Sequence, residues 1–382
     1  MALTNKLSAI GNAIREKTGK TELMTLDAMP AAIAGIETGG GGSIEVEPIV
    51  LTGDCSSACR GAIAANYIGL FGDTITTSNI TTANYMFQKY AGATIPFEIN
   101  FQNYSNSSWN YHECHNLFSD AINLTELPVM NNFKPSLTDS MFANCNRLRT
   151  IPENFDANWD WSYIDDNTDE WSASRSMSFY RCYSLRSIPT SFLAHCNPYC
   201  TPGYSLYYYS FYSCYALDEL VLPVFNTQVD WYYDSGFGNA FDDCHRLKRM
   251  VFMGTENKPR WCGQTIDLSR SVGWGSPTRI CGYNSGITAD KEVKDAATYE
   301  ALKNDPDWFS YDPRYARYNH DSAVETINSL PDTSAFCAEM GDTNTIKFDS
   351  RNGSLTDGGA IGSLTDAEIA VAAAKGWTVT LV

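Results

Sequence analysis

Residues 142–152 read FANCNRLRTIP, and this stretch decides the fold because versions of it recur along the middle of the chain. Each version has Phe, then Cys or Ala, then Leu, then Leu, Ile or Met, at intervals of three residues. Successive Phe residues are 24, 37, 32 and 30 positions apart, which is typical of the coils of repeat proteins. The five copies are Phe118-Ala121-Leu124-Leu127, Phe142-Cys145-Leu148-Ile151, Phe179-Cys182-Leu185-Ile188, Phe211-Cys214-Leu217-Leu220 and Phe241-Cys244-Leu247-Met250.

Stacking is the physical reason for such a repeat. One coil of this length cannot bury its own apolar edge, whereas coils stacked in register share a continuous apolar ladder. We expect Leu and Ile to flank a short strand, which Pro128, Pro152 and Pro189 end in the first three units. The predicted ladder residues are Phe118, Phe142, Cys145, Leu148, Phe179, Cys182, Leu185, Phe211, Cys214, Leu217, Phe241, Cys244 and Leu247.

The repeat reads as F-x-x-C-x-x-L-x-x-I-x-x-P and resembles the BspA-like leucine-rich repeats of bacterial surface antigens and phage proteins. The resemblance covers roughly residues 84–255. It implies a solenoid of short parallel strands that serves adhesion to proteins or glycans without intrinsic catalysis. The predicted fold class is therefore a repeat solenoid, with a leucine-rich-repeat body at residues 44–255 and irregular insertions between its units.

The first 36 residues carry two apolar stripes at helical spacing, so we expect two short helices. Such a small pair cannot bury enough surface alone, and the linker ETGGGGS at residues 37–43 separates it from the body. We therefore expect attachment or self-association, with a local helical cap on the body as the alternative. The stripes consist of Leu3, Leu7, Ile10, Ile14, Leu26, Met29, Ile33 and Ile36.

This segment also resembles the N-terminal module of many tailed-phage tail and baseplate-associated proteins. The resemblance rests on LTNKLSAIGNAIREKTGKTELMTLDAMPAAIAGI, with its IREKTG turn and its L-x-x-M-P-x-x-I-x-x-I close. It implies attachment to other tail or baseplate proteins through residues 1–36. Analogy with tail fibres suggests a homo-oligomer, with a trimer as the first candidate. Because the chain starts without a secretory signal, we expect folding in the host cytoplasm and action outside the cell within the virion tail.

Composition restricts the classes of partner. The 382 residues include 27 Lys and Arg against 44 Asp and Glu, a formal net charge of −17, which argues against nucleic acid as a partner. A hydrophobic content of 43% is too high for wholesale disorder. No apolar run reaches the length of a membrane span, so we expect no membrane insertion. In a reducing cytosol the twelve cysteines are expected to be free thiols.

The insertions ahead of the repeats are rich in Trp and Tyr, interleaved with Asn and Asp. Because they precede the same register, we expect them to emerge on the same side of the body. Their rings could fold back and seal the ladder, or they could form a binding ridge in which aromatic faces stack on sugars. The candidates for ligand binding are Trp159, Trp161, Trp171, Tyr207, Tyr208, Trp231 and Tyr232.

A basic row follows the ladder Leu. Arg149, Arg186 and Lys248 share one register, which Thr125 and Asp218 interrupt in other units. These cations could line a face that holds phosphate or carboxylate groups. The alternative is an ordinary solvated strand face.

Catalytic and metal-binding motifs are weak, so we expect no enzyme, no cofactor and no metal. The pair His112 and His115 lacks the second half of a zinc site, and the acidic run at 165–170 lacks the Gly and Glu of a calcium loop. The predicted function is non-enzymatic binding of a host-surface glycan or cell-wall polymer. The alternatives are a purely structural tail, baseplate or decoration protein, and a glycan-cleaving tailspike enzyme whose carboxylates would meet only in the fold.

Residues 256–382 are predicted to hold further repeats and a helix-strand cap. We expect short helices at 290–304 and 322–330, a helix opened by a capping box from Thr365 to Glu368, and a final strand at 377–382. The ending LTDAEIAVAAAKGWTVT resembles the terminal unit found after BspA-like repeats. Such a unit would cover the open end of the ladder.

Overall fold

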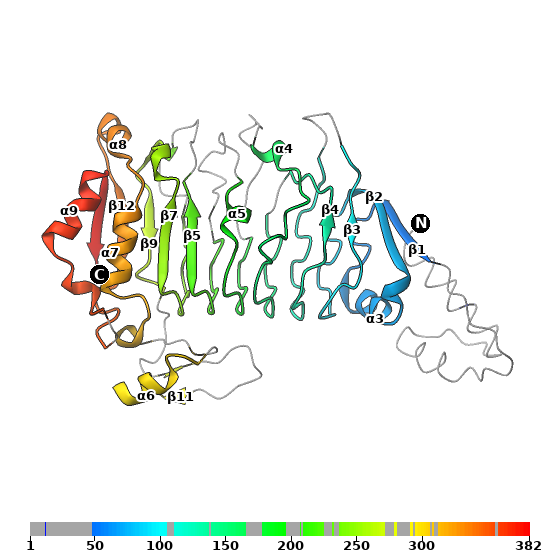
Figure 1. The fold of residues 1–382 in the computed structure, drawn as a ribbon, viewed down its shortest axis with the longest axis horizontal. Helices are drawn as coiled ribbons and strands as arrows, with labels where there is room; N and C mark the ends of the chain where they lie inside the picture. The colour runs from blue at the N-terminus through cyan, green and yellow to red at the C-terminus, as the bar shows by residue number, and fades with distance from the viewer. Residues whose placement is uncertain are drawn as a thin grey trace.

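The computed structural model describes residues 12, 48–104, 111–136, 139–165, 178–195, 207, 209–224, 231–232, 237–271, 279–280, 291–292, 295–305, 308, 312–355 and 358–382. The predicted attachment residues from Leu3 to Ile36 and the linker at 37–43 lie outside these ranges. The described chain forms an elongated body that runs from β1 at one end to α9 at the other (Figure 1).

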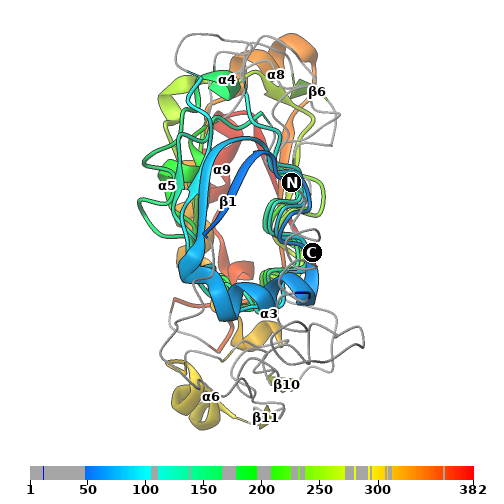
Figure 2. The same cartoon turned by 90° about the vertical axis from the view of Figure 1, so that its right-hand side faces the viewer.

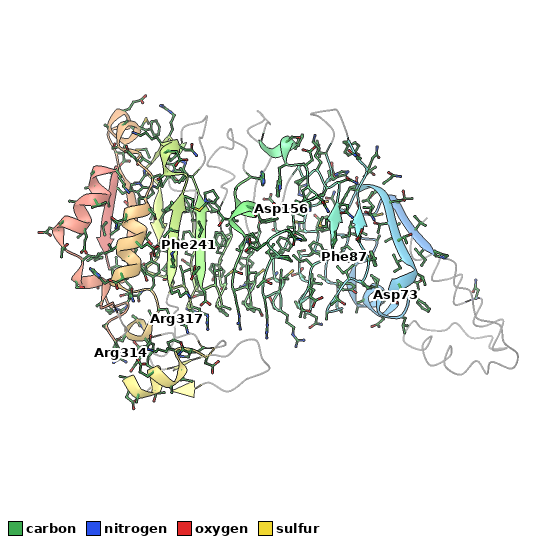
Figure 3. The ribbon with its side chains drawn as sticks, in the orientation of Figure 1. Asp73, Phe87, Asp156, Phe241, Arg314 and Arg317 are labelled. Carbon is green, nitrogen blue, oxygen red and sulfur yellow. The ribbon has the colours of Figure 1, made fainter. Side chains whose placement is uncertain are left out.

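Six Phe rings stack in one column inside the body, and Figure 3 labels the first and the last of them. Successive ring centroids lie 5.6, 5.8, 5.5, 5.9 and 6.0 Å apart, and successive ring planes lie within 16° of parallel. Each ring is at most 2% exposed, so the column forms the centre of the apolar core. Its members are Phe87, Phe118, Phe142, Phe179, Phe211 and Phe241.

Backbone hydrogen bonds join each of these Phe-centred turns to the next. The amide of Phe118 donates to the carbonyl of Met141 at 2.9 Å, and the amide of Phe142 donates to the carbonyl of Ser178 at 3.0 Å. The described residues two positions before and two after each Phe have left-handed backbone with positive φ. They are Tyr85, Lys89, Asn116, Asp120, Ser140, Asn144, Arg181, Tyr209, Ser213, Asn239 and Asp243.

The predicted leucine-rich-repeat solenoid is wrong, because the described strands do not form one continuous parallel sheet along the body. They form separate sheets of two or three strands. In the first three units Pro128, Pro152 or Pro189 follows the ladder directly and offers no amide donor, so no strand runs through these prolines, and in the first unit a two-residue strand begins only at Met130. Between the second and third units an isolated β-bridge joins Thr150 and Ser187 at this position.

Strands do form after the ladder in the last two units, because no Pro follows the ladder directly there. β5 (Glu219–Pro223) pairs in parallel with β7 (Arg249–Met253). Four further described sheets contain β1 (Ile49–Asp54) and β2 (Ile75–Thr82); β3 (Ile99–Asn100) and β4 (Met130–Asn131); β6 (Trp231–Tyr232) and β8 (Trp261–Cys262); and β12 (Asn344–Phe348) between β9 (Thr265–Asp267) and β13 (Trp377–Leu381). These four are parallel, whereas β10 (Arg279–Ile280) and β11 (Lys291–Glu292) pair antiparallel.

The longest described helices lie at the two ends of the body. α3 lies at the N-terminal end, and α7, α8 and α9 lie at the C-terminal end (Figure 1). The described α-helices are α3 (Gly61–Phe71), α4 (Ser162–Asp165), α5 (Thr190–Leu193), α6 (Ala296–Leu302), α7 (His320–Ser329), α8 (Ser334–Met340) and α9 (Asp366–Ala374). The short 3-10 helices are η2 (Gly72–Thr74), η4 (Thr255–Asn257), η5 (Pro313–Tyr315) and η6 (Ile361–Ser363).

At the C-terminal end, the predicted capping box of α9 is confirmed. The Thr365 hydroxyl accepts from the Glu368 amide at 3.3 Å, and the Glu368 carboxylate accepts from the Thr365 amide at 2.7 Å. α9 packs on β13, where the buried indole of Trp377 donates to the carbonyl of Pro331 at 3.0 Å. The helices expected at 290–304 and 322–330 are α6 and α7, with different bounds.

The segment that carries β10, β11 and α6 lies outside the body (Figures 1 and 2). Tyr299 of α6 packs with Trp308 and Tyr315 in a small apolar cluster of its own. The buried Arg246 ties this segment to the body, because its guanidinium donates to the carbonyls of Asp305 at 3.0 Å and Trp308 at 3.2 Å.

Candidate functional site

The predicted aromatic binding ridge is wrong for Trp159 and Trp161, which are only 9% and 6% exposed. The ring of Trp159 lies 5.1 Å from that of Phe155, and the ring of Trp161 stacks on His195 at 4.4 Å. The Trp161 indole donates to Asp156 at 3.1 Å. These rings fold back and seal the body, because burying them against other aromatic rings removes large apolar surfaces from water.

The prediction that Tyr207 binds a ligand is wrong for the same reason. It is 2% exposed, and its ring stacks on that of Phe237 at 5.5 Å, beside the Phe column. Of the other predicted ligand-binding aromatics, Trp231 and Tyr232 form strand β6. Trp171 and Tyr208 lie outside the described residues.

The predicted basic row does form one line on the body. The amide of Arg186 donates to the carbonyl of Arg149 at 2.8 Å, Asp218 follows through a bond of 3.2 Å to Arg186, and Lys248 follows Asp218 at 2.9 Å. Arg149 and Lys248 are exposed and Arg186 is half-buried. Lys248 pairs with Glu219 at 3.3 Å, so this line carries both signs of charge.

Two rows of tyrosines on consecutive Phe-centred turns form a second candidate surface, the tyrosine face. The rings of Tyr180 and Tyr212 stack at 5.2 Å, and those of Tyr183 and Tyr215 stack at 4.8 Å. Their repeat positions, one and four residues after the Phe, could have revealed the rows in the sequence. Tyr209, two residues before Phe211, adds a ring 6.2 Å from Tyr180 and 5.4 Å from Tyr212. All members of the face are half-buried: Tyr180, Tyr183, Tyr209, Tyr212 and Tyr215.

The tyrosine face also carries a cation. The guanidinium carbon of Arg181 lies 4.9 Å from the centroid of the Tyr180 ring, and Arg181 is exposed. Burial and then the charge of Asp243 raise the pKa of Tyr212, so its hydroxyl stays a hydrogen-bond donor at neutral pH. Because the rings are already stacked on one another, a ligand meets side chains that have little conformational entropy left to lose.

The described residues contain no group of three or more His, Cys, Asp or Glu side chains placed to hold a metal ion. His112, one of the two histidines whose spacing is too incomplete for a zinc site, is buried, and its Nδ1 accepts from the amide of Lys134 at 2.9 Å. Burial lowers the pKa of His112 to about 4 and that of His245 to about 3. Both rings are therefore neutral parts of the core at physiological pH.

No helix within the described ranges is long and apolar enough to cross a membrane. Comparison with protein-family models, with curated proteins and with solved structures found no match to this chain. No relative therefore assigns this chain to a class of protein, and its own surfaces are the evidence for its role.

Proposed function

We propose that this chain is a non-enzymatic binding protein of a phage tail that contacts a glycan or cell-wall polymer on the host surface. The tail assignment is supported by the sequence resemblance of residues 1–36. The binding role is supported by the tyrosine face, which carries the proposal.

The chemistry of the tyrosine face suits recognition of a polymer. The stacked rings are only half-buried and carry hydroxyl groups, and Arg181 adds a fork of donors beside Tyr180. Tyr and Arg are also enriched in protein–protein interfaces, so the same surface would suit a purely structural tail protein. The ligand class is thus the question that an experiment must answer.

A bacterial glycan array probed with the full chain tests the proposal. We expect selective binding that Tyr180→Ser combined with Tyr212→Ser weakens about thirtyfold, since two aromatic contacts of about 1 kcal/mol each contribute about 2 kcal/mol. The control is the same change at Tyr111 and Tyr163, whose rings pack at 4.4 Å outside this face. The absence of any glycan binding, or an equal loss in both double variants, would contradict the proposal.

A further inference from the structure

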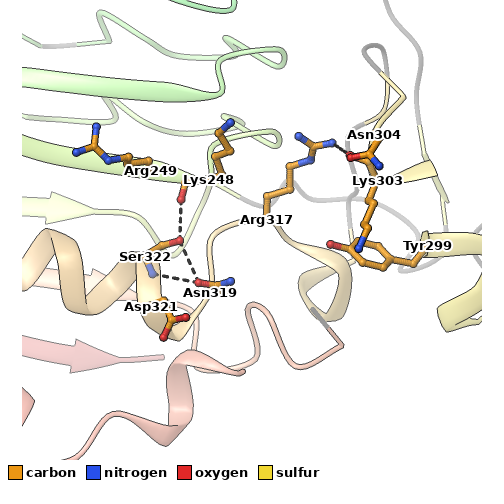
Figure 4. Close-up of a pocket in the computed structure, with 9 residues that line it drawn as sticks. All are labelled: Lys248, Arg249, Tyr299, Lys303, Asn304, Arg317, Asn319, Asp321 and Ser322. Atoms are coloured by element: carbon orange, nitrogen blue, oxygen red, sulfur yellow. Dashed lines mark hydrogen bonds between the residues drawn. The ribbon is translucent and has the colours of Figure 1, made fainter. Parts of the chain in front are cut away.

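Three segments far apart in the sequence meet around a pocket of about 400 Å³, which we term the junction pocket (Figure 4). Lys248 immediately precedes β7 and Arg249 begins it, Lys303 follows α6, and Arg317 precedes α7. Among the described lining residues these four cations face a single carboxylate, Asp321. The lining itself therefore carries a net positive charge in a chain of net charge −17.

The carboxylates that pair with these cations lie outside the lining. Glu219 lies 3.3 Å from Lys248 and 3.8 Å from Arg249, Glu325 lies 2.8 Å from Arg249, and Glu300 lies 2.7 Å from Lys303. The Glu219 and Glu300 side chains are 47% and 55% exposed. Ion pairs this exposed to water contribute little free energy, so the cations can turn toward a bound anion at small cost.

Arg317 is the fixed cation of the pocket. Its side chain is 13% exposed, and its guanidinium donates to the carbonyl of Lys303 and lies 3.5 Å from Asp218. Arg246 uses the same carboxylate of Asp218. Burial and the charge of Arg246 lower the pKa of Arg317 to about 10.

The N-terminus of α7 adds to the positive potential. Asn319 caps this helix by accepting from the amide of Ser322 at 3.0 Å, and the Ser322 hydroxyl donates to the carbonyl of Lys248 at 2.6 Å. The positive end of the helix dipole therefore lies beside the cations. Asp321 lies 3.2 Å from one ring nitrogen of His320, whose other ring nitrogen lies 3.3 Å from Glu368.

We propose that the junction pocket binds a phosphate group. A phosphate presents oxygens in several directions and so accepts from Lys and Arg donors on three sides of a pocket. The volume also leaves room for the molecule that carries the phosphate. The site is independent of the role proposed for the tyrosine face, so either proposal can fail without the other.

Titration of the full chain with inorganic phosphate at low ionic strength tests this site. The fluorescence of Trp308 is a local reporter, because the guanidinium carbon of Arg317 lies 5.1 Å from its ring. We expect saturable binding at one site, weakened by added salt. Lys248→Met combined with Lys303→Met should lower the affinity about tenfold, as charge-assisted hydrogen bonds are lost.

Two further variants separate binding from folding. Asp321→Asn removes the described carboxylate of the lining and should raise the affinity, which a misfolded variant cannot do. Lys347→Met on β12 removes a positive charge away from the pocket and should leave the affinity unchanged. Absence of saturable binding, or an equal loss in Lys347→Met, would overturn the proposal.

Dimethyl phosphate identifies the source of the phosphate group. Weaker binding than that of inorganic phosphate would support a free or terminal phosphate. Equal binding would support the phosphodiester of a polymer, because a diester carries one charge.

Discussion

At the scale of single residues, the repeated Cys shows how the sequence indicates a packing position but not its hydrogen bond. The repeat predicted a small apolar side chain at this register, and the four thiols are buried. Each thiol also donates to the carbonyl of the preceding column Phe, as from Cys182 to Phe142 at 3.0 Å and from Cys214 to Phe179 at 3.2 Å. Burial raises the pKa of Cys182 to about 12, so the thiol remains protonated and able to donate.

The candidate site shows the limit of sequence reasoning at this scale. The aromatic insertions allowed either rings that seal the ladder or an exposed ridge, and Trp159 and Trp161 pack against Phe192 of α5, which the chain reaches only after another insertion. Exposure depends on such distant neighbours, which spacing along the chain does not reveal. The tyrosine rows could have been predicted from the sequence, because they recur at fixed positions of the repeat.

His112 supplies a pH-dependent test. The unfolded chain binds a proton near pH 6.5, whereas the folded chain does so near pH 4 because the ring is buried. Stability is therefore full above about pH 6.5 and falls as the pH drops toward 4, by about 3 kcal/mol for this group. Urea unfolding at pH 7, 5.5 and 4.5 should show a smaller decline in His112→Asn than in the parent chain. An identical decline in both would contradict this assignment.

At the scale of elements, the prediction of strands was wrong where the backbone hydrogen bonds between units form in the Phe-centred turns instead. The apolar pattern correctly aligned the Phe-centred turns, yet the bonds between early units pass through those turns rather than through strands after the Leu. Left-handed residues allow this arrangement, and Asn116, Asp120 and Asn144 are the residue types that tolerate it. Their recurrence two positions from Phe was a readable signal.

Lys89 occupies a left-handed backbone position, which Lys adopts at a higher free-energy cost than Asn. It is exposed and has a φ of 58°, while its amide donates to the carbonyl of Ser119 at 2.9 Å. Lys89→Asn should raise the free energy of unfolding by about 0.5–1 kcal/mol, because Asn adopts left-handed backbone at lower cost. Lys347→Asn, in the extended strand β12, should destabilise instead. Thermal unfolding of both variants checks the opposite signs, and a loss of stability in Lys89→Asn would refute the argument.

At the scale of the whole molecule, the Phe column and the turn-to-turn bonds connect units separated by long insertions. Each ring has a neighbour on both sides except at the ends, so the middle of the column should be the most sensitive part of the body. The two proposed binding surfaces lie on this common frame. The tyrosine face belongs to the turns around Phe179 and Phe211, and the junction pocket begins at Lys248 after the last column turn.

The free energy of unfolding of Phe179→Ala, measured by urea denaturation of the full chain, tests this account most directly. Phe179 stacks on Phe142 at 5.5 Å and on Phe211 at 5.9 Å and is 2% exposed. The account predicts a loss of about 3–5 kcal/mol in a single cooperative transition. A loss below about 1 kcal/mol would show that the column does not hold the body together.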